Sequence, residues 1–346
     1  MKRFLMILGV FLLFSDYILN AQSRWIFYRK DPKGNFHYYD INSMNWIEDD
    51  IVEVWKKTIY SEKGRNEWIE NLIKWGIPIE KAKKLYKCNV WYRIDVKNKK
   101  LKILKSVYYD EEGDVISSSE YPEVLSDWSS IVPDSIGELI WQEMSEFQEI
   151  GVIKKIIKKN PENPIHYYLL GRKYEFLSYY YLSFSVLEIE EKNEFSKSEK
   201  TMRQLAAIYF MDAFNRTDIK TFPFEMVKIK NANFQKEDIS KILKSYFLYE
   251  YYSNIYTPLP NKLFLSLTHI KTIEDSIKVW EDKSKKIPFE LNISIIADPL
   301  TENKTFDVFI DLDMLFSLLI SAYYGEENIE KVCECFYRYG VYLLEN

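Results

Sequence analysis

The feature that most constrains the fold is the alternation of hydrophobic and polar residues in short segments between residues 24 and 122. A period of two places successive side chains on opposite faces of a strand, and the β-branched and aromatic residues in these segments favour strands. Six segments have this character: RWIFYRK (24–30), NFHYYDI (35–41), IVEVWKKTIY (51–60), CNVWYRIDV (88–96), LKILKSVYY (101–109) and DVISSSE (114–120). Most of their connections are short, so we expect antiparallel pairing.

Helical patterns interrupt and then close this strand region. NEWIENLIKWG (66–76) has apolar residues at helical spacing and ends on glycine. Further on, Ser135 and Glu138 have the spacing of a capping box. The apolar residues that follow, Ile136, Leu139, Ile140, Met144 and Phe147, recur on one helical face. We expect this helix to pack on the sheet and to complete a first domain over residues 24–147.

From residue 151 onward, helical patterns replace the strand patterns. We expect helices at 160–177, 198–215, 235–254, 272–285, 308–323 and 326–344, and one extended segment, FELNISIIAD (289–298). The sequence therefore predicts an α+β protein in which an antiparallel sheet with packed helices is followed by an all-α helical domain over residues 151–346.

The segment 160–177 (NPENPIHYYLLGRKYEFL) resembles the first helix of a tetratricopeptide repeat, in its Asn-Pro opening and its Leu-Gly pair. The expected partner helix, YYYLSFSVLEIEEKN (179–193), lacks the usual small residue, and no second copy follows one period later. The resemblance implies at most degenerate helix pairs.

The N-terminus has the pattern of a signal peptide over residues 1–21. Lys2 and Arg3 precede an apolar run that is too short to span a bilayer, and Ala21 lies where cleavage is expected. An uncleaved membrane anchor is the alternative. The later segment 314–324 is also short for a membrane span. We expect an exported, soluble mature chain, either periplasmic or extracellular at the cell surface.

The net charge and the cysteines argue against nucleic-acid binding and against a reactive-thiol site. The net charge of −5 gives no basic excess for holding nucleic acid. Three cysteines, Cys88, Cys333 and Cys335, leave at least one without an intrachain partner. Residues two apart on a helix point away from each other, so a bridge between Cys333 and Cys335 is not expected. We expect buried, unreactive thiols.

Three short motifs have the residue types of chemical sites. His37, Asp40 and Ser43 could form a triad, but positions 37 and 40 face opposite sides of a strand. DEEGD (110–114) lacks the ligand spacing of a calcium loop, and DLD (311–313) suits a helix N-terminus. The sequence therefore predicts turns and caps at these positions, and no catalytic, cofactor-binding or metal-binding residue.

Several of these segments, taken in order, resemble the surface-adhesin protein E family over residues 24–145. They are Trp25, the turn at Gly34, YYDINSM, IVEVWKK, Cys88, YYDEEGDVISS and WSSIVPDSIGELIW. The resemblance implies an α+β domain of an exported protein that binds extracellular-matrix proteins. It also implies a second cysteine in the closing helix, which reads LIWQEMSEF here and has none. Cys88 would then pair, if at all, with Cys333 or Cys335.

The functional prediction is an exported, non-enzymatic bacterial binding protein, adhesin-like and located in the envelope or at the surface. Its partner would be an extracellular-matrix or envelope protein. The alternative is a periplasmic structural or assembly scaffold that acts through the helical domain. An enzyme of unrecognised type ranks third.

Overall fold

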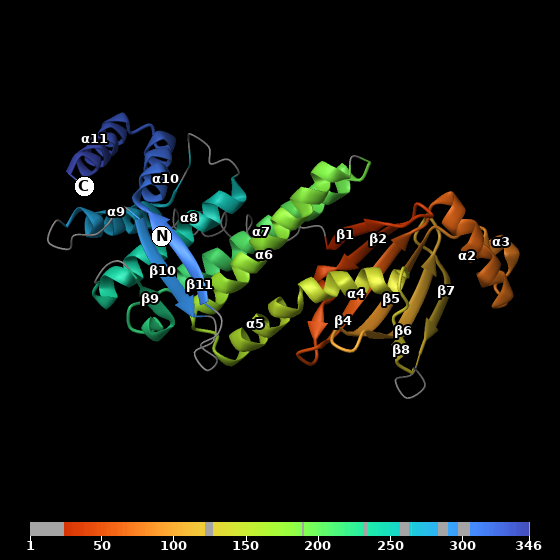
Figure 1. Cartoon of the computed structure of the whole chain (residues 1–346). Helices are drawn as coiled ribbons and strands as arrows, with labels where there is room; N and C mark the ends of the chain where they lie inside the picture. Colours follow the sequence, from red (N-terminus) through yellow and green to blue (C-terminus); the bar gives the residue numbers. More distant parts are fainter. Residues whose placement is uncertain are drawn as a thin grey trace, which may run out of the picture. The chain divides into compact units, whose positions relative to one another are not determined.

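The protein is α+β, with an antiparallel sheet followed mostly by helices (Figure 1). The computed structural model describes residues 24–121, 127–188, 190–230, 234–256, 263, 265–282, 290–296 and 305–345. The chain divides into two compact units. The first holds the chain up to Val152 together with Leu177–Thr201, and the second holds Ile153–Phe176 and the chain from Met202 onward. The first unit is therefore discontinuous in sequence, because a segment of two long helices returns to it.

The first unit is built on an eight-stranded sheet, and every pair of hydrogen-bonded strands in it is antiparallel. Its strands are β1 (Trp25–Lys30), β2 (Phe36–Asp40), β3 (Asn45–Trp46), β4 (Ile51–Ile59), β5 (Lys87–Asp95), β6 (Lys100–Tyr109), β7 (Val115–Glu120) and β8 (Ser129–Ser130). The order along the sheet is β1-β2-β4-β5-β6-β7, while β3 pairs with β4 and β8 pairs with β6. The six predicted strands and their antiparallel pairing are confirmed.

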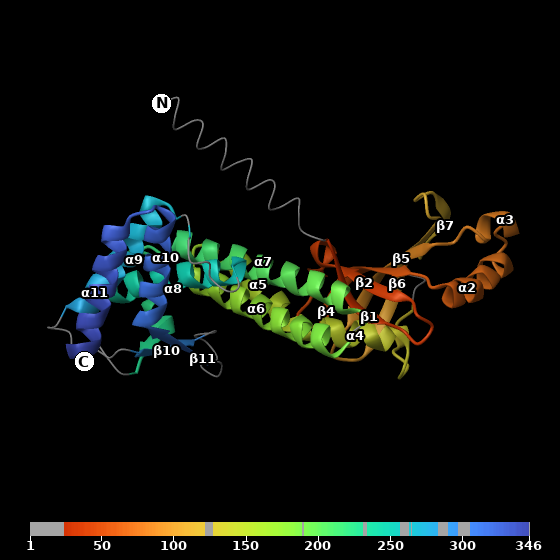
Figure 2. The same ribbon diagram turned by 90° about the horizontal axis from the view of Figure 1, so that it is seen from above.

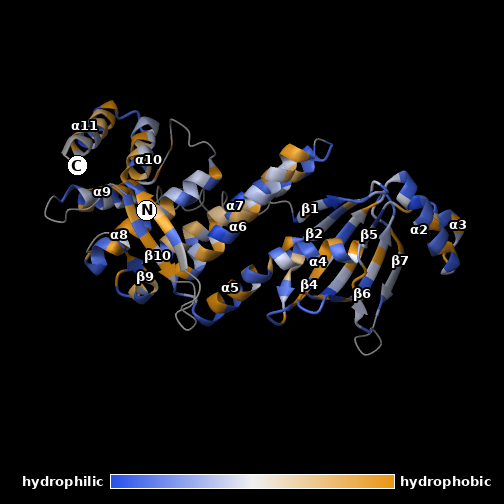
Figure 3. Cartoon of the chain, in the orientation of Figure 1, coloured by the Kyte–Doolittle hydropathy of each residue, from blue (hydrophilic) through white to orange (hydrophobic). Residues whose placement is uncertain are grey.

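Alternation along the central strand β4 determines which side chains enter the core. Val52, Val54, Lys56 and Thr58 are buried, and the residues between them are half-buried. Figure 3 shows hydrophobic residues interspersed with hydrophilic ones along the strands. Because strand side chains have a period of two, a lysine two residues after a core valine must point into the core.

Short helices cover this core face of the sheet. Helix α4 (Ile136–Glu146) crosses it, and α2 (Glu62–Lys74) and α3 (Ile79–Ala82) lie at the end where β4 finishes and β5 begins (Figures 1 and 2). The predicted cap of α4 is present, since Ser135 Oγ accepts the Glu138 N–H at 3.2 Å. The Glu138 carboxylate accepts the N–H of Asp134 rather than that of Ser135. Helix α4 thus begins at the predicted residue. The hydrogen bond that Glu138 returns in the capping box goes to the residue before Ser135.

The edge strand β1 is covered by the tips of two long helices, α6 (Pro164–Leu187) and α7 (Lys192–Arg216). Ser198 Oγ accepts the Phe27 N–H at 3.0 Å and lies 3.1 Å from the Phe27 carbonyl oxygen. The Phe195 ring packs edge-on against Phe27, with centroids 4.8 Å apart. A serine therefore satisfies the backbone groups that an edge strand would otherwise leave open to a second strand.

The second unit contains parts of α5 (Gln148–Lys159), α6 and α7, together with α8 (Lys236–Ile255), α9 (Leu267–Glu281), α10 (Leu312–Gly325) and α11 (Ile329–Glu345). Its core includes Tyr168, whose ring stacks on Phe247 with centroids 5.0 Å apart. Gly171 allows α7 to approach closely, because a Cβ there would lie 2.7 Å from the Phe210 ring. The predicted helices of this region are present, with shifted ends.

The prediction of an all-α second domain is wrong in one respect. A three-stranded antiparallel sheet joins β9 (Val227–Ile229), β10 (Glu290–Ile296) and β11 (Thr305–Asp311). Only β10 was expected as extended chain. Residues 308–311, predicted as the start of a helix, belong to β11, and the helix begins after the N-cap Asp311. The segment TFDVFID pairs with β10 along its whole length. Its apolar residues continue the helical spacing of the residues after it, but they form a strand because of this pairing.

The segment compared with a tetratricopeptide repeat also folds differently from that pattern. Residues 179–187, taken as the start of a second helix, continue α6 without a break. No glycine or proline occurs between Gly171 and the end of this helix, so nothing in the sequence turns the chain there. Within the described residues, no helix is both long enough and apolar enough to cross a membrane.

Candidate functional site

His37, Asp40 and Ser43 have separate partners in the structure. The Asp40 carboxylate pairs with Arg24 and accepts the Asn42 N–H at 3.1 Å, which caps a short 3-10 turn. Ser43 Oγ donates to the Asp40 carbonyl oxygen at 2.8 Å and accepts the backbone N–H of Trp55 at 3.0 Å. Asp40 and Ser43 therefore terminate the strand, as their sequence pattern predicts.

His37 instead joins a buried chain of polar groups on the core face. Its Nε2 lies 3.0 Å from Asp31 Oδ2, and its Nδ1 lies 3.1 Å from Thr58 Oγ1. Lys56 Nζ donates to the same Thr58 oxygen at 2.9 Å. Hydrogen bonds thus link four side chains in the order Asp31–His37–Thr58–Lys56, which we call the polar chain. Its members come from the turn after β1, from β2 and from β4.

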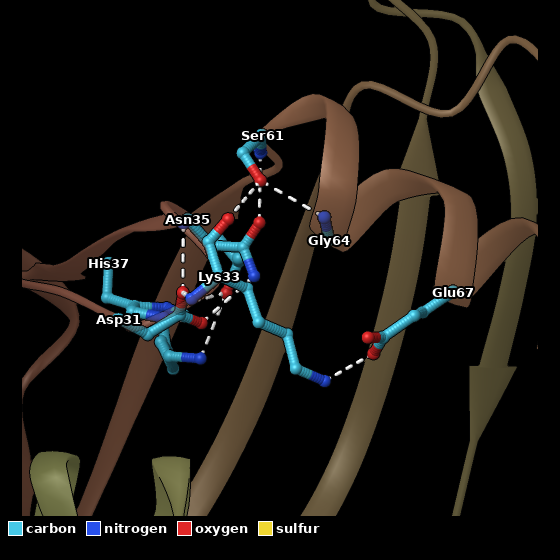
Figure 4. A network of polar contacts seen from close by, with 9 residues as sticks. Asp31, Lys33, Asn35, His37, Ser61, Gly64 and Glu67 are labelled. Carbon is cyan, nitrogen blue, oxygen red and sulfur yellow. Dashed lines mark hydrogen bonds and ion pairs between the residues drawn. The ribbon is translucent and has the colours of Figure 1, made fainter.

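The start of the polar chain is fixed by the β1–β2 turn (Figure 4). The Asp31 carboxylate accepts the backbone N–H groups of Lys33 and Asn35 and the Asn35 side-chain amide, each at 2.9 Å. Asn35 Oδ1 in turn accepts the Ser61 N–H at 2.9 Å. Gly64 is required beside this amide, because a Cβ there would lie 2.1 Å from Asn35 Oδ1. The turn and the start of α2 therefore hold Asp31 in place.

The pKa values determine where the protons of the polar chain lie. Burial and the neighbouring Lys56 charge lower the pKa of His37 to about 4, so its ring is neutral at pH 7. Burial opposes ionisation of Asp31, but hydrogen bonds from His37 and Asn35 outweigh it and hold that pKa well below its usual range. A carboxylate only accepts, so His37 carries its proton on Nε2 and accepts the Thr58 hydroxyl proton on Nδ1. The Thr58 oxygen then has a lone pair for Lys56.

A cavity of about 300 Å³ lies next to Lys56, between the sheet, α2 and the first residue of α4. Its walls are mainly aromatic and apolar, and its polar groups are few. The lining residues are Asn35, Lys56, Thr58, Tyr60, Trp68, Trp75, Cys88, Val90, Tyr92, Ile103, Ser106, Tyr108, Tyr121 and Ile136. Trp75 is 60% exposed and Tyr121 is 43% exposed, so aromatic rings also form its rim. Size and lining match those of small-molecule sites, which are concave and mostly apolar with a few placed polar groups.

The Cys88 thiol and the phenols of Tyr60 and Tyr108, which line the cavity, are uncharged at pH 7. Burial raises the pKa of Cys88 to about 11, and burial also raises the pKa of Tyr60 well above its usual value. Burial raises the pKa of Tyr108 in the same way. These groups therefore present neutral hydrogen-bonding atoms at pH 7 and supply no negative charge to Lys56.

Asp31, His37 and Thr58 have the same order of groups as a hydrolytic triad, with threonine in the place of the nucleophile. Two features weaken that interpretation. The side chain of His37 is completely buried, and the Thr58 oxygen already accepts a hydrogen bond from an ammonium group, which reduces its nucleophilicity. The arrangement is better suited to holding Lys56 Nζ at the cavity wall than to attacking a substrate.

The other motifs have structural roles. Asp110 Oδ1 accepts the Asp114 N–H at 2.7 Å within a tight turn, and Gly113 there has a φ of +93°. Asp311 Oδ1 accepts the Met314 N–H at 3.0 Å as the N-cap of α10. Across the described ranges, no group of three or more His, Cys, Asp or Glu side chains is arranged to hold a metal ion.

All three cysteines are free thiols. Cys88 and Cys335 are buried, as expected, but Cys333 is exposed, so the prediction of buried thiols is wrong for that residue. On α11 the two positions differ by two residues and so face different sides of the helix.

The second unit has its own buried charges. Arg172 pairs with Glu175 and, at 3.4 Å, with Glu250. The Asn254 amide donates to Glu175 at 3.1 Å. Burial and the neighbouring Glu175 raise the pKa of Glu250. In this cluster the buried charges of both signs lie together, which indicates a packing role.

In comparisons with known proteins, no protein-family model, no curated protein and no solved structure matches the chain.

The residues that matter most here, Asp31, Thr58 and Lys56, were not identified as site residues from the sequence. One signal was available, because Lys56 follows Val52 and Val54 at the period of a half-buried strand. Alternation alone therefore places a lysine in the core. It does not reveal a cavity there, because the cavity depends on how α2 packs.

Proposed function

We propose that this chain is an exported, non-enzymatic binding protein of the bacterial envelope or surface, and that its first unit binds a small aromatic or apolar molecule. The observation that carries the proposal is the aromatic-lined cavity beside Lys56. Export is supported by the signal-peptide pattern of residues 1–21. The adhesin-like character is supported by the motif resemblance over residues 24–145.

A protein partner from the extracellular matrix or envelope is the second candidate. The exposed aromatic side chains Trp75 and Tyr121 at the rim of the cavity favour it, since aromatic residues are enriched at protein interfaces. The net charge of −5 does not favour nucleic acid as a partner.

Indole, a planar and uncharged probe, tests the first candidate by isothermal titration calorimetry on the full chain. We expect saturable binding that Val90→Phe weakens at least about tenfold, because the added ring occupies space along the cavity wall. Glu111→Phe adds the same ring at an exposed turn and should leave binding unchanged. Thermal unfolding of each variant checks that it is folded.

Two results would count against the small-molecule site: no binding of indole, or equal binding by the Val90→Phe variant. If the chain then retains extracellular-matrix protein on an immobilised surface, the second candidate replaces the first.

A further inference from the structure

Of the described residues that line the cavity, Lys56 alone has a charged side chain. Its side chain extends from β4 into the core face, and only 3% of the residue is exposed. Among the described residues, no aspartate or glutamate lines the same space. This described lining therefore carries one fixed positive charge and no negative charge.

The ammonium group of Lys56 is incompletely bonded. It has three N–H donors, and within the described chain it makes one hydrogen bond, to Thr58 Oγ1. In that same part of the chain it forms no ion pair. The nearby Asp31 carboxylate is already engaged by His37, Asn35 and Lys33. The two remaining donors make no hydrogen bond to an anionic group of the described residues.

The neighbouring acids do not fill this role. Burial keeps the Cys88 thiol and the phenols of Tyr60 and Tyr108 protonated at pH 7. An unpaired buried cation is costly, and proteins usually provide it with a counter-charge. The Asp31 charge favours the charged form of Lys56 from a distance, but no carboxylate of the described residues is bonded to the ammonium group. This leaves room for an anionic group that enters the cavity.

The polar chain holds Lys56 in a defined position for such a partner. Thr58 is held by His37, and His37 is held by Asp31, whose carboxylate is fixed by the turn before β2. An ammonium that is positioned in advance binds an anion without losing the rotamer freedom of a flexible lysine. The remaining walls are aromatic rings, which suit an apolar or aromatic body.

We propose that the cavity binds a small aromatic or apolar monocarboxylate, with the carboxylate on Lys56 Nζ and the apolar body between Trp68, Trp75 and the sheet. The proposal rests on the proposed small-molecule function and names its ligand class. One fixed cation matches one negative charge, and a charge-assisted hydrogen bond in a buried site is stronger than a neutral one.

The test compares 3-phenylpropanoate with 3-phenylpropanamide, which has nearly the same shape and no charge, by isothermal titration calorimetry on the full chain at pH 7. We expect the carboxylate to bind at least about tenfold more tightly than the amide. Lys56→Met should reduce this preference to less than about twofold, and Lys56→Arg should retain part of it.

Lys57→Met is the matched control. Lys57 is the next residue on the same strand but points to the opposite face, where Nζ lies 4.7 Å from the Trp25 ring centroid and 4.3 Å from that of Tyr38. This variant also removes one positive charge, so it should keep the full preference for the carboxylate. Circular dichroism confirms the fold of each variant.

The outcomes separate the two proposals. If wild type binds both probes equally, or if the Lys56→Met variant keeps the preference, the monocarboxylate is the wrong ligand class while the small-molecule site stands. If wild type binds neither these probes nor indole, the small-molecule function itself is overturned, and this inference with it.

Discussion

The two compact units bury charge in different ways. In the second unit, Arg172 forms ion pairs with Glu175 and Glu250, and the Asn254 amide donates a hydrogen bond to Glu175, so each buried carboxylate has a cationic partner. In the first unit, Lys56 has a threonine as its one hydrogen-bond partner among the described residues and faces a cavity. The Arg172 cluster is expected to hold helices together. The buried charge of Lys56 lowers the stability of the fold unless a ligand enters the cavity, which is how a binding site differs from a structural cluster.

The largest expected effect comes from Arg172→Met. This change leaves two buried carboxylates without their cation, and breaking a buried ion pair from one side costs about 3–5 kcal/mol. The Arg172 side chain is 43% exposed, so solvent screening places the expected loss at the low end, about 3 kcal/mol. Urea denaturation measures the free energy of unfolding.

Lys241→Met, an exposed position on α8, is the control and should change the free energy of unfolding by less than about 0.5 kcal/mol. An equal effect of the two variants would remove the basis for treating the Arg172 cluster as structural.

The next effect concerns the thiols. Burial raises the pKa of Cys88 to about 11, two units above the usual value of 9.0, so its thiolate fraction is about 100-fold lower than that of an ordinary cysteine. Cys333 is exposed. We therefore expect iodoacetamide to label Cys333 first and Cys88 at least about 100-fold more slowly, as measured by mass spectrometry of digested samples.

In urea, all three cysteines should react at similar rates, which provides the control. Fast labelling of Cys88 in the folded chain would mean that this thiol is not buried, and the description of the core beside Lys56 would then be wrong.

The smallest expected effect is a gain in the free energy of unfolding, caused by a substitution of Lys56. Lys56→Met removes the buried ammonium and retains much of the side-chain volume, so the ligand-free chain should be more stable by about 1 kcal/mol. Burial lowers the Lys56 pKa from 10.5 to about 8, so below pH 8 the folded state carries the full penalty of the charge. Between pH 8 and 10.5 the unfolded state binds more protons, and wild type gains stability relative to the variant.

Urea denaturation of both proteins at pH 7 and pH 10 measures this gain. Its disappearance at the higher pH supports the interpretation. A loss of stability in Lys56→Met at pH 7 would mean that Lys56 is a structural residue like Arg172.

Much of the first unit could be predicted from its sequence, because its signals are local. Alternation in IVEVWKKTI, the turn DPKG and the cap at Ser135 each depend on neighbouring residues, and each is present in the structure. The second sheet depends in part on partners far apart in the sequence. Strands β10 and β11 are consecutive, but β10 also pairs with β9 from before α8, and no local pattern could reveal that pairing.

The candidate site was hidden because it depends on how the strands pair. His37 was noticed with Asp40 and Ser43, whereas its partners are Asp31 on the other side of the β1–β2 turn and Thr58 on another strand. The strand register brings one of these partners opposite His37, since β2 pairs His37 with Thr58 on β4.

The contact of Ser198 with the edge of β1 has a consequence for the order in which the chain can fold. All eight strands of the first sheet have been synthesised by Ser130, but the residue that closes its open edge is the later Ser198. During synthesis from the N-terminus, the sheet passes through a period in which β1 can pair with another chain. The first unit reaches its protected form only after both long helices have emerged, so its folding depends on contacts distant in sequence and is expected to be slow.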